Sequence, residues 1–301
     1  MSRSAGLGAL LSSMIAAVQW RLLLLWLLIM LIPATVVALP LWRMLGGLLD
    51  HSVHAAEWAQ HFSDLMFSDV LFNLLDHPQW FGAAAIMGVS LTLLLSPFLA
   101  GMIVGSGRAG RVLGFGALLQ NGLIEYGRMF RLMLWSLLPY AVVIAVAAMG
   151  SNMADKHAEK AVLESQADAG AHAARWLLLV VFVLVQAMVE SARAAFIADG
   201  GLRSATRAMG RGIMQLLRRP LGTLLFYLVV SLVGVAIAGA LGILRIHTTA
   251  VGTGGFLLAL LFSQLMVMAV GWMRTARLFA LAAVARSVGA GRRSSSLSSA
   301  R

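Results

Sequence analysis

Residues 22–41 read LLLLWLLIMLIPATVVALPL, a run of 20 residues without a charged side chain. A run of about 18 or more apolar residues is long enough to cross the hydrocarbon core of a bilayer as a helix. Five further runs, each predominantly apolar, follow it. The six predicted spans are residues 22–41, 81–104, 132–149, 176–196, 221–244 and 256–273. The sequence therefore predicts an all-α fold, a polytopic membrane bundle of six transmembrane helices.

The composition agrees with this fold. Of the 301 residues, 60% are hydrophobic and 12% are charged, and the charged fraction is about half that of an ordinary soluble protein. The longest segment between spans, residues 42–80, is too short for an independent soluble domain. We expect residues 1–286 to form a single membrane domain and residues 287–301 to form a basic, flexible cytoplasmic tail. The chain has no cysteine, which excludes disulfides, thiolate metal sites and cysteine nucleophiles.

Charge alternates between the connecting segments. Arginines gather in residues 1–21, 105–131, 197–220 and 274–301, whereas most acids lie in residues 42–80 and 150–175. By the positive-inside rule both termini are cytoplasmic. The same bias explains the net charge of +11, so we expect no nucleic-acid binding. We expect instead that anionic lipid headgroups bind the cytoplasmic face, with about 1 kcal/mol for each basic residue near them.

Three segments before spans have apolar residues at helical spacing. Residues 7–18, 115–130 and 202–216 are predicted to be amphipathic helices on the cytoplasmic surface. Residues 8–11 and 116–119 both read GALL. The pattern indicates three parallel hairpin repeats, each made of a surface helix, a span, an outer loop and a span. The alternative is a chance similarity between apolar sequences.

A longer motif leads into the fifth span. Residues 192–199 read ARAAFIAD, and Ser204, Arg207, Arg211 and the RRP of residues 218–220 follow. This junction resembles one in uncharacterised bacterial multi-span inner-membrane proteins related to the membrane domain of glycerophosphodiester phosphodiesterases. The likeness covers roughly a third of the chain and includes no catalytic residue. It implies a helical membrane fold and a bacterial inner-membrane location.

Glu190 is the one acid within the predicted spans, and an ionisable group at that depth is a candidate functional site. Gln186 and Gln264 could line a polar cavity with it, or form hydrogen bonds between helices. Arg193 follows Glu190 by one helical turn, so a structural ion pair near the interface is the alternative for the charged residues.

The outer segment carries His54, Glu57 and His61 at helical spacing, with Asp50 and Asp64 on the same face. Imidazole and carboxylate groups could bind zinc or respond to pH. The same pattern arises on the solvated face of an interfacial helix, and we favour that interpretation. We therefore predict no metal and no cofactor.

Motifs of catalysis are absent from the sequence. Gly105, Gly107 and Gly110 form a GxGxxG, but it follows an apolar helix where a nucleotide-binding motif would follow a strand. There is no GxSxG or HExxH motif, so we expect no enzyme activity. We predict a transport-related, lipid-handling or membrane-organising protein. The alternative is a scaffold or accessory subunit of a membrane complex, with a protein partner or as a homo-oligomer.

Overall fold

The computed structural model describes residues 6–49, 68, 70–72, 78–160, 164–249 and 252–298, and no strand occurs among them. The helices are α1 (Leu7–Ala16), α2 (Trp20–Leu49), α5 (Pro78–Ala109), α6 (Phe115–Lys160), α7 (Glu164–Ala198), α8 (Ala205–Arg218), α9 (Pro220–Ile246) and α10 (Gly252–Ser298). Six of them, α2, α5, α6, α7, α9 and α10, are long and apolar enough to cross a membrane. The predicted six-span helical fold is confirmed.

Two boundaries differ from the prediction. The second predicted surface helix is the first part of α6 and continues into the span without a break. No proline interrupts the helix before Pro139. The last helix, α10, continues through residues 287–298, where the sequence predicts a flexible tail. That segment contains no proline, so every residue in it can donate a backbone hydrogen bond to the helix.

The other two surface segments are separate helices, α1 and α8. Ser204 caps α8, because its side chain accepts a hydrogen bond from the backbone N–H of Arg207 at 3.3 Å. Pro220 begins α9 directly after α8, in the first helical turn that tolerates proline. The chain therefore changes direction between α8 and α9.

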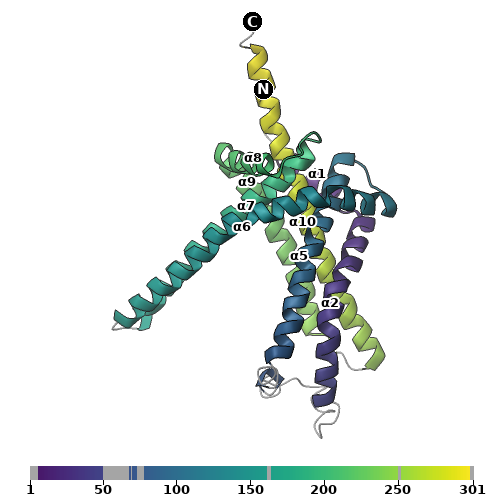
Figure 1. Ribbon diagram of the computed structural model, residues 1–301, viewed down its shortest axis with the longest axis vertical. Helices are drawn as coiled ribbons and strands as arrows, with labels where there is room; N and C mark the ends of the chain where they lie inside the picture. Colours follow the sequence, from purple (N-terminus) through teal and green to yellow (C-terminus); the bar gives the residue numbers. More distant parts are fainter. Residues whose placement is uncertain are drawn as a thin grey trace.

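Consecutive spans pack against each other as three hairpins: α2 with α5, α6 with α7, and α9 with α10 (Figure 1). The connections between hairpins lie at one end of the molecule, together with α1 and α8. We call this the arginine-rich end. Its described arginines are Arg21, Arg108, Arg111, Arg128, Arg131, Arg203, Arg207, Arg211, Arg218, Arg219, Arg274, Arg277 and Arg286.

The pair α6 and α7 diverges from the other four spans, and we call its outer part, residues 134–160 and 164–184, the projecting hairpin (Figure 1). The beginning of α6 packs on α5, and the end of α7 packs on α8 and α10. Large apolar side chains are exposed along the projecting hairpin. They include Leu137, Leu138, Val142, Ile144, Met149, Trp176, Leu177, Val180 and Phe182.

The small-residue positions of α5 and α9 are used inside the chain. A Cβ atom added at Gly101 would lie 3.0 Å from the backbone oxygen of Gly122 on α6. A Cβ atom at Gly234 would overlap the side chain of Met273 on α10. These glycines let neighbouring helices approach closely.

Candidate functional site

Glu190 is the acid that the sequence singles out, and it is 3% exposed on α7. Nη1 of Arg193 donates a hydrogen bond to Oε1 of Glu190 at 3.0 Å. The ion pair expected from the sequence spacing is therefore formed. Both side chains lie within the span of residues 170–198, so the pair is buried among apolar helices.

Two arginines of α10 lie near this pair. Arg274 and Arg277 both interact electrostatically with Glu190. Arg277 is 9% exposed, and its Nη1 donates to the hydroxyl of Tyr227 at 3.3 Å. The guanidinium of Arg277 also lies 5.3 Å from the centroid of the Tyr227 ring, a cation–π contact. The partner of Arg274 is an aromatic ring as well, that of Trp26 at 5.7 Å.

Helix α7 packs on α6, α9 and α10. Tyr140 of α6 interacts electrostatically with both Glu190 and Arg193. We call the group the Glu190 cluster. Its members are Glu190, Arg193, Arg274, Arg277, Tyr140 and Tyr227.

Positive charge exceeds negative charge in the Glu190 cluster. Arginine stays protonated in proteins, so three guanidinium groups and one carboxylate leave a net charge of +2. In addition, Nε of Arg277 is buried without a hydrogen-bond partner among the described residues. Buried charges are normally paired, because burying an isolated charge is costly. Positive charge therefore dominates the surroundings of Glu190.

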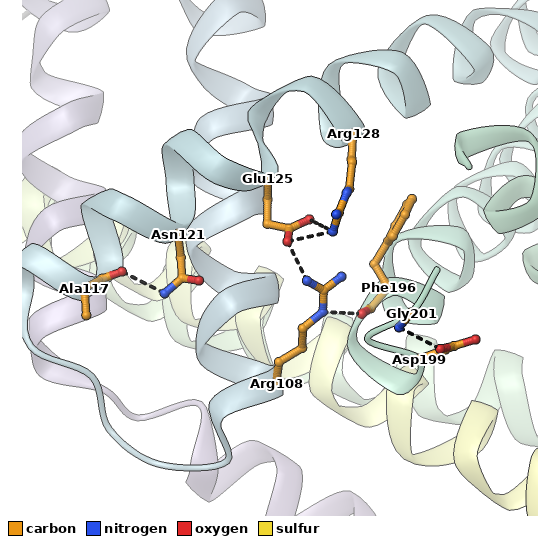
Figure 2. Close-up of polar contacts among 8 residues, drawn as sticks. All are labelled: Arg108, Ala117, Asn121, Glu125, Arg128, Phe196, Asp199 and Gly201. Carbon is orange, nitrogen blue, oxygen red and sulfur yellow. Dashed lines mark hydrogen bonds and ion pairs between the residues drawn. The ribbon is translucent and has the colours of Figure 1, made fainter. Parts of the chain in front are cut away.

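A second charged group, the Glu125 cluster, contains Glu125, Arg108 and Arg128 (Figure 2). Glu125 is 3% exposed on α6 and accepts hydrogen bonds from Arg108 at 2.5 Å and Arg128 at 3.0 Å. Nε of Arg108 donates to the backbone oxygen of Phe196 at 2.7 Å. This cluster connects α5, α6 and the end of α7.

Sequence reasoning missed Glu125, because this residue lies in a segment that is predicted to be a surface helix. One signal was present. Glu125 and Arg128 have the same three-residue spacing as Glu190 and Arg193. A carboxylate with an arginine one turn later marks both buried clusters.

The two candidate glutamines do not join Glu190 through hydrogen bonds in the described part of the chain. Gln186 is half-buried one turn before Glu190 on α7. Gln264 is half-buried on α10, ten residues before Arg274, which corresponds to about 15 Å along the helix. Among the described residues, the hydrogen-bond partner of Glu190 is thus Arg193 of its own helix and not Gln264.

The outer residues His54, Glu57 and His61 lie outside the described residues. Within the described ranges, no group of three or more histidines, aspartates or glutamates could hold a metal ion.

Asp199 directly follows the last residue of α7 and lies at the surface. Nη1 of Arg211 donates to Oδ2 of Asp199 at 2.6 Å, and the backbone N–H of Gly201 donates to Oδ1 at 2.9 Å. These contacts hold the pKa of Asp199 below its ordinary value, the hydrogen bond from Arg211 having the largest effect. Figure 2 shows Asp199 with Gly201, close to the carbonyl of Phe196. The turn between α7 and α8 is therefore fixed beside the Glu125 cluster.

Two open cavities of about 400 Å³ each lie at the arginine-rich end. The first lies between α6 and the start of α8, and its lining includes Arg131, Trp135 and Arg203. The second lies beneath α1, and its lining includes Arg111 and Arg286. Each cavity combines two arginines with apolar surface, an arrangement suited to a headgroup with its chain.

No known protein family, curated protein or solved structure matches this chain.

Proposed function

We propose that this chain is an integral protein of the bacterial inner membrane that handles anionic lipid and has no catalytic activity of its own. The supporting observation is the concentration of arginines at one end of a six-span bundle, where both cavities open. Arginine forms paired hydrogen bonds with phosphate and attracts anionic headgroups from a distance. By the positive-inside rule, the arginine-rich end faces the cytoplasm.

The first cavity supports this function in most detail. Arg131 and Arg203 come from different elements and line the same space. Trp135, near the start of the projecting hairpin, lines the same space, and an indole ring favours the depth of a membrane interface. A phospholipid can place its phosphate between the arginines and its acyl chains along the hairpin.

The test is lipid selection by the purified chain. We expect the protein to retain phosphatidylglycerol in preference to phosphatidylcholine when it is extracted from vesicles containing equal amounts of both. Mass spectrometry of the retained lipids gives the ratio. Equal retention of the two lipids would contradict the proposal.

A variant at the first cavity sharpens this test. Arg203→Gln removes one basic residue and should weaken phosphatidylglycerol retention about fivefold, the equivalent of about 1 kcal/mol. The matched control is Arg245→Gln, because Arg245 lies in the last turn of α9, at the opposite end of the bundle. A loss of similar size in the control would show that the effect does not depend on the arginine-rich end.

The projecting hairpin favours a second candidate function, that of a scaffold or accessory subunit. Its exposed apolar side chains could contact another membrane protein or a second copy of this chain. We then expect a partner of fixed stoichiometry to remain bound through gentle extraction. Recovery of a monomer associated with lipid alone would exclude this candidate. The small-residue positions Gly101 and Gly234 offer no support for it, since helices of the same chain already cover them.

A further inference from the structure

We propose that the second cavity, beneath α1, binds a phosphate ester that carries free hydroxyl groups, such as the headgroup of phosphatidylglycerol. The inference rests on the proposed lipid function and deepens it, because it names the headgroup chemistry that one of the two cavities selects. Residues of α1, α5, α7 and α10 line this cavity, together with the turn that follows α5.

The cationic part of the lining consists of Arg111 and Arg286, which are both exposed. Arg111 lies in the turn after α5, where Gly110 has a φ of +61°. Arg286 belongs to α10, so distant parts of the chain bring positive charge to one space. Within the described ranges, neither arginine forms an ion pair or a side-chain hydrogen bond. Their N–H groups are therefore available for phosphate oxygens, which arginine contacts through paired hydrogen bonds.

The serines of the lining have already used their hydroxyl protons. Oγ of Ser12 and Oγ of Ser13 both donate to the backbone oxygen of Ala9, at 3.0 Å and 2.7 Å. Oγ of Ser106 donates to Oε1 of Gln19 at 2.5 Å. A hydroxyl group has one proton and two lone pairs, so each serine offers a ligand only hydrogen-bond acceptors. This side of the cavity therefore fits a ligand that brings its own donors.

A hydroxyl group suits this lining better than an ammonium group does. The described residues that line the cavity include two arginines and no carboxylate. Like charges repel, so the ammonium of phosphatidylethanolamine would lie near two guanidinium groups without a negative side chain to compensate. A hydroxyl group carries no charge and donates to a serine oxygen without this cost. The cavity thus fits phosphate oxygens on its arginine side and hydroxyl groups on its serine side.

The outer face of α1 indicates that the cavity lies at the depth of lipid headgroups. Leu7, Leu11 and Ile15 recur every four residues on this helix and are 72%, 58% and 73% exposed. A helix with an exposed apolar stripe lies in the membrane interface, with the stripe at the boundary between headgroups and acyl chains. A lipid headgroup is therefore close to the cavity. A soluble ester such as glycerol 3-phosphate shares the same chemistry, and the experiment separates the two sources.

The experiment measures lipid binding to the full-length chain, purified in neutral detergent, by native mass spectrometry. The probes are phosphatidylglycerol and phosphatidylethanol with identical acyl chains. Both are singly charged phosphodiesters, but only phosphatidylglycerol has hydroxyl groups in its headgroup. We expect phosphatidylglycerol to bind about three- to tenfold more tightly, because its hydroxyl groups add hydrogen bonds. Equal affinity for the two lipids would overturn the inference.

Serine variants locate the hydroxyl side of the site. Ser12→Ala combined with Ser13→Ala should reduce the preference for phosphatidylglycerol to less than about twofold and leave phosphatidylethanol binding unchanged. Both hydroxyl groups bond only the backbone of their own helix, and Ser12→Ala alone, at an exposed position, serves if the double variant does not fold. The matched control is Ser151→Ala on the projecting hairpin, because Ser151 also donates to the backbone oxygen three residues earlier at 3.0 Å. A preference that survives the serine substitutions would contradict this cavity as the site.

Arginine variants locate the phosphate side. Arg111→Gln should weaken both lipids about fivefold and keep the preference between them, since the two lipids carry the same phosphate. The control Arg207→Gln removes an exposed arginine of α8 that does not line the cavity, and should weaken both lipids by less than about twofold. Equal losses in the two variants would contradict the assigned position of the phosphate.

Further outcomes separate this inference from the proposed function. A chain that prefers phosphatidylglycerol to phosphatidylcholine, but binds phosphatidylethanol equally well, would overturn the site and leave the proposed function intact. Binding of glycerol 3-phosphate that is weakened in Arg111→Gln, without any preference among lipids, would support the site and contradict the lipid function. Tighter binding of phosphatidylethanolamine than of phosphatidylglycerol would overturn the assignment of hydroxyl groups as the donors.

Discussion

Glu125 shows how much one buried side chain can hold together in this molecule. Its carboxylate contacts arginines of α5 and α6, and Arg108 extends the connection to the last turn of α7. The surface pair of Asp199 and Arg211 has a similar geometry but is about half exposed. Exposed ion pairs contribute little, because water and salt screen them. The buried ion pairs of Glu125 therefore have a larger structural role than the exposed ion pair of Asp199.

This difference can be measured. Glu125→Gln leaves Arg108 and Arg128 without their carboxylate, and we expect it to lower the free energy of unfolding by about 1–3 kcal/mol. The control Arg211→Gln breaks the exposed pair and should cost less than about 1 kcal/mol. Unfolding of both variants by denaturant in the same detergent gives the comparison. Equal losses would show that burial of the Glu125 cluster has no energetic consequence.

The two buried acids were not equally predictable at the residue scale. Glu190 lies inside an apolar run, so its unusual depth and its pairing with Arg193 follow from the sequence. The partners of Arg274 and Arg277 do not, because they depend on how α10 packs against other helices. Arg277 contacts Tyr227 of α9, which lies 50 positions earlier in the chain. Hydropathy assigns these arginines to the cytoplasmic margin and gives no information about what they face.

At the scale of elements, α8 illustrates how glycine positions set the distance between helices. A Cβ atom added at Gly212 would lie 2.6 Å from the backbone oxygen of Met188 and 2.7 Å from the backbone nitrogen of Ala192, both on α7. At Gly210, on the same helix, the added atom would meet nothing within 4 Å. One glycine is therefore required for the contact between α8 and α7, and the other is not.

The two positions make a matched pair of variants. Gly212→Ala should destabilise the protein by about 1–3 kcal/mol, because backbone atoms of α7 cannot move aside easily. Gly210→Ala should be neutral or stabilise it by up to about 1 kcal/mol, since alanine favours a helix over glycine. Thermal unfolding in detergent reports the difference. A destabilising effect at Gly210, with none at Gly212, would contradict the packing of α8 on α7.

Hydropathy located the six spans but not every helix boundary. The segment of residues 115–130 is amphipathic, as predicted, yet it continues into the span of α6. An amphipathic pattern shows which residues share a face, and it does not show whether a turn follows. The turn before α9 was better specified, because Pro220 and the Ser204 cap mark the ends of α8 locally.

At the scale of the whole molecule, the three hairpins give a bundle with two distinct ends. Arginines, α1 and α8 lie toward one end of the bundle, and the start of α5 and the end of α2 lie toward the other (Figure 1). The orientation proposed from charge requires the first end to be cytoplasmic.

The lack of native cysteine makes this orientation simple to test, since an introduced thiol is the one reactive site. Thr206 is exposed at the arginine-rich end, and His247 is exposed at the opposite end. In intact cells, a membrane-impermeant maleimide should label His247→Cys and leave Thr206→Cys unlabelled until the membrane is permeabilised. Labelling of Thr206→Cys in intact cells would reverse the proposed topology.

The contact between Arg108 and the carbonyl of Phe196 has a consequence for biogenesis. The two residues are 88 positions apart, whereas Glu125 follows Arg108 by 17. During synthesis the guanidinium meets its carboxylate well before the ribosome has made the carbonyl. The ion pair that joins α5 to the start of α6 can therefore form early, and the bond from Arg108 to the end of α7 closes only after the fourth span has been inserted.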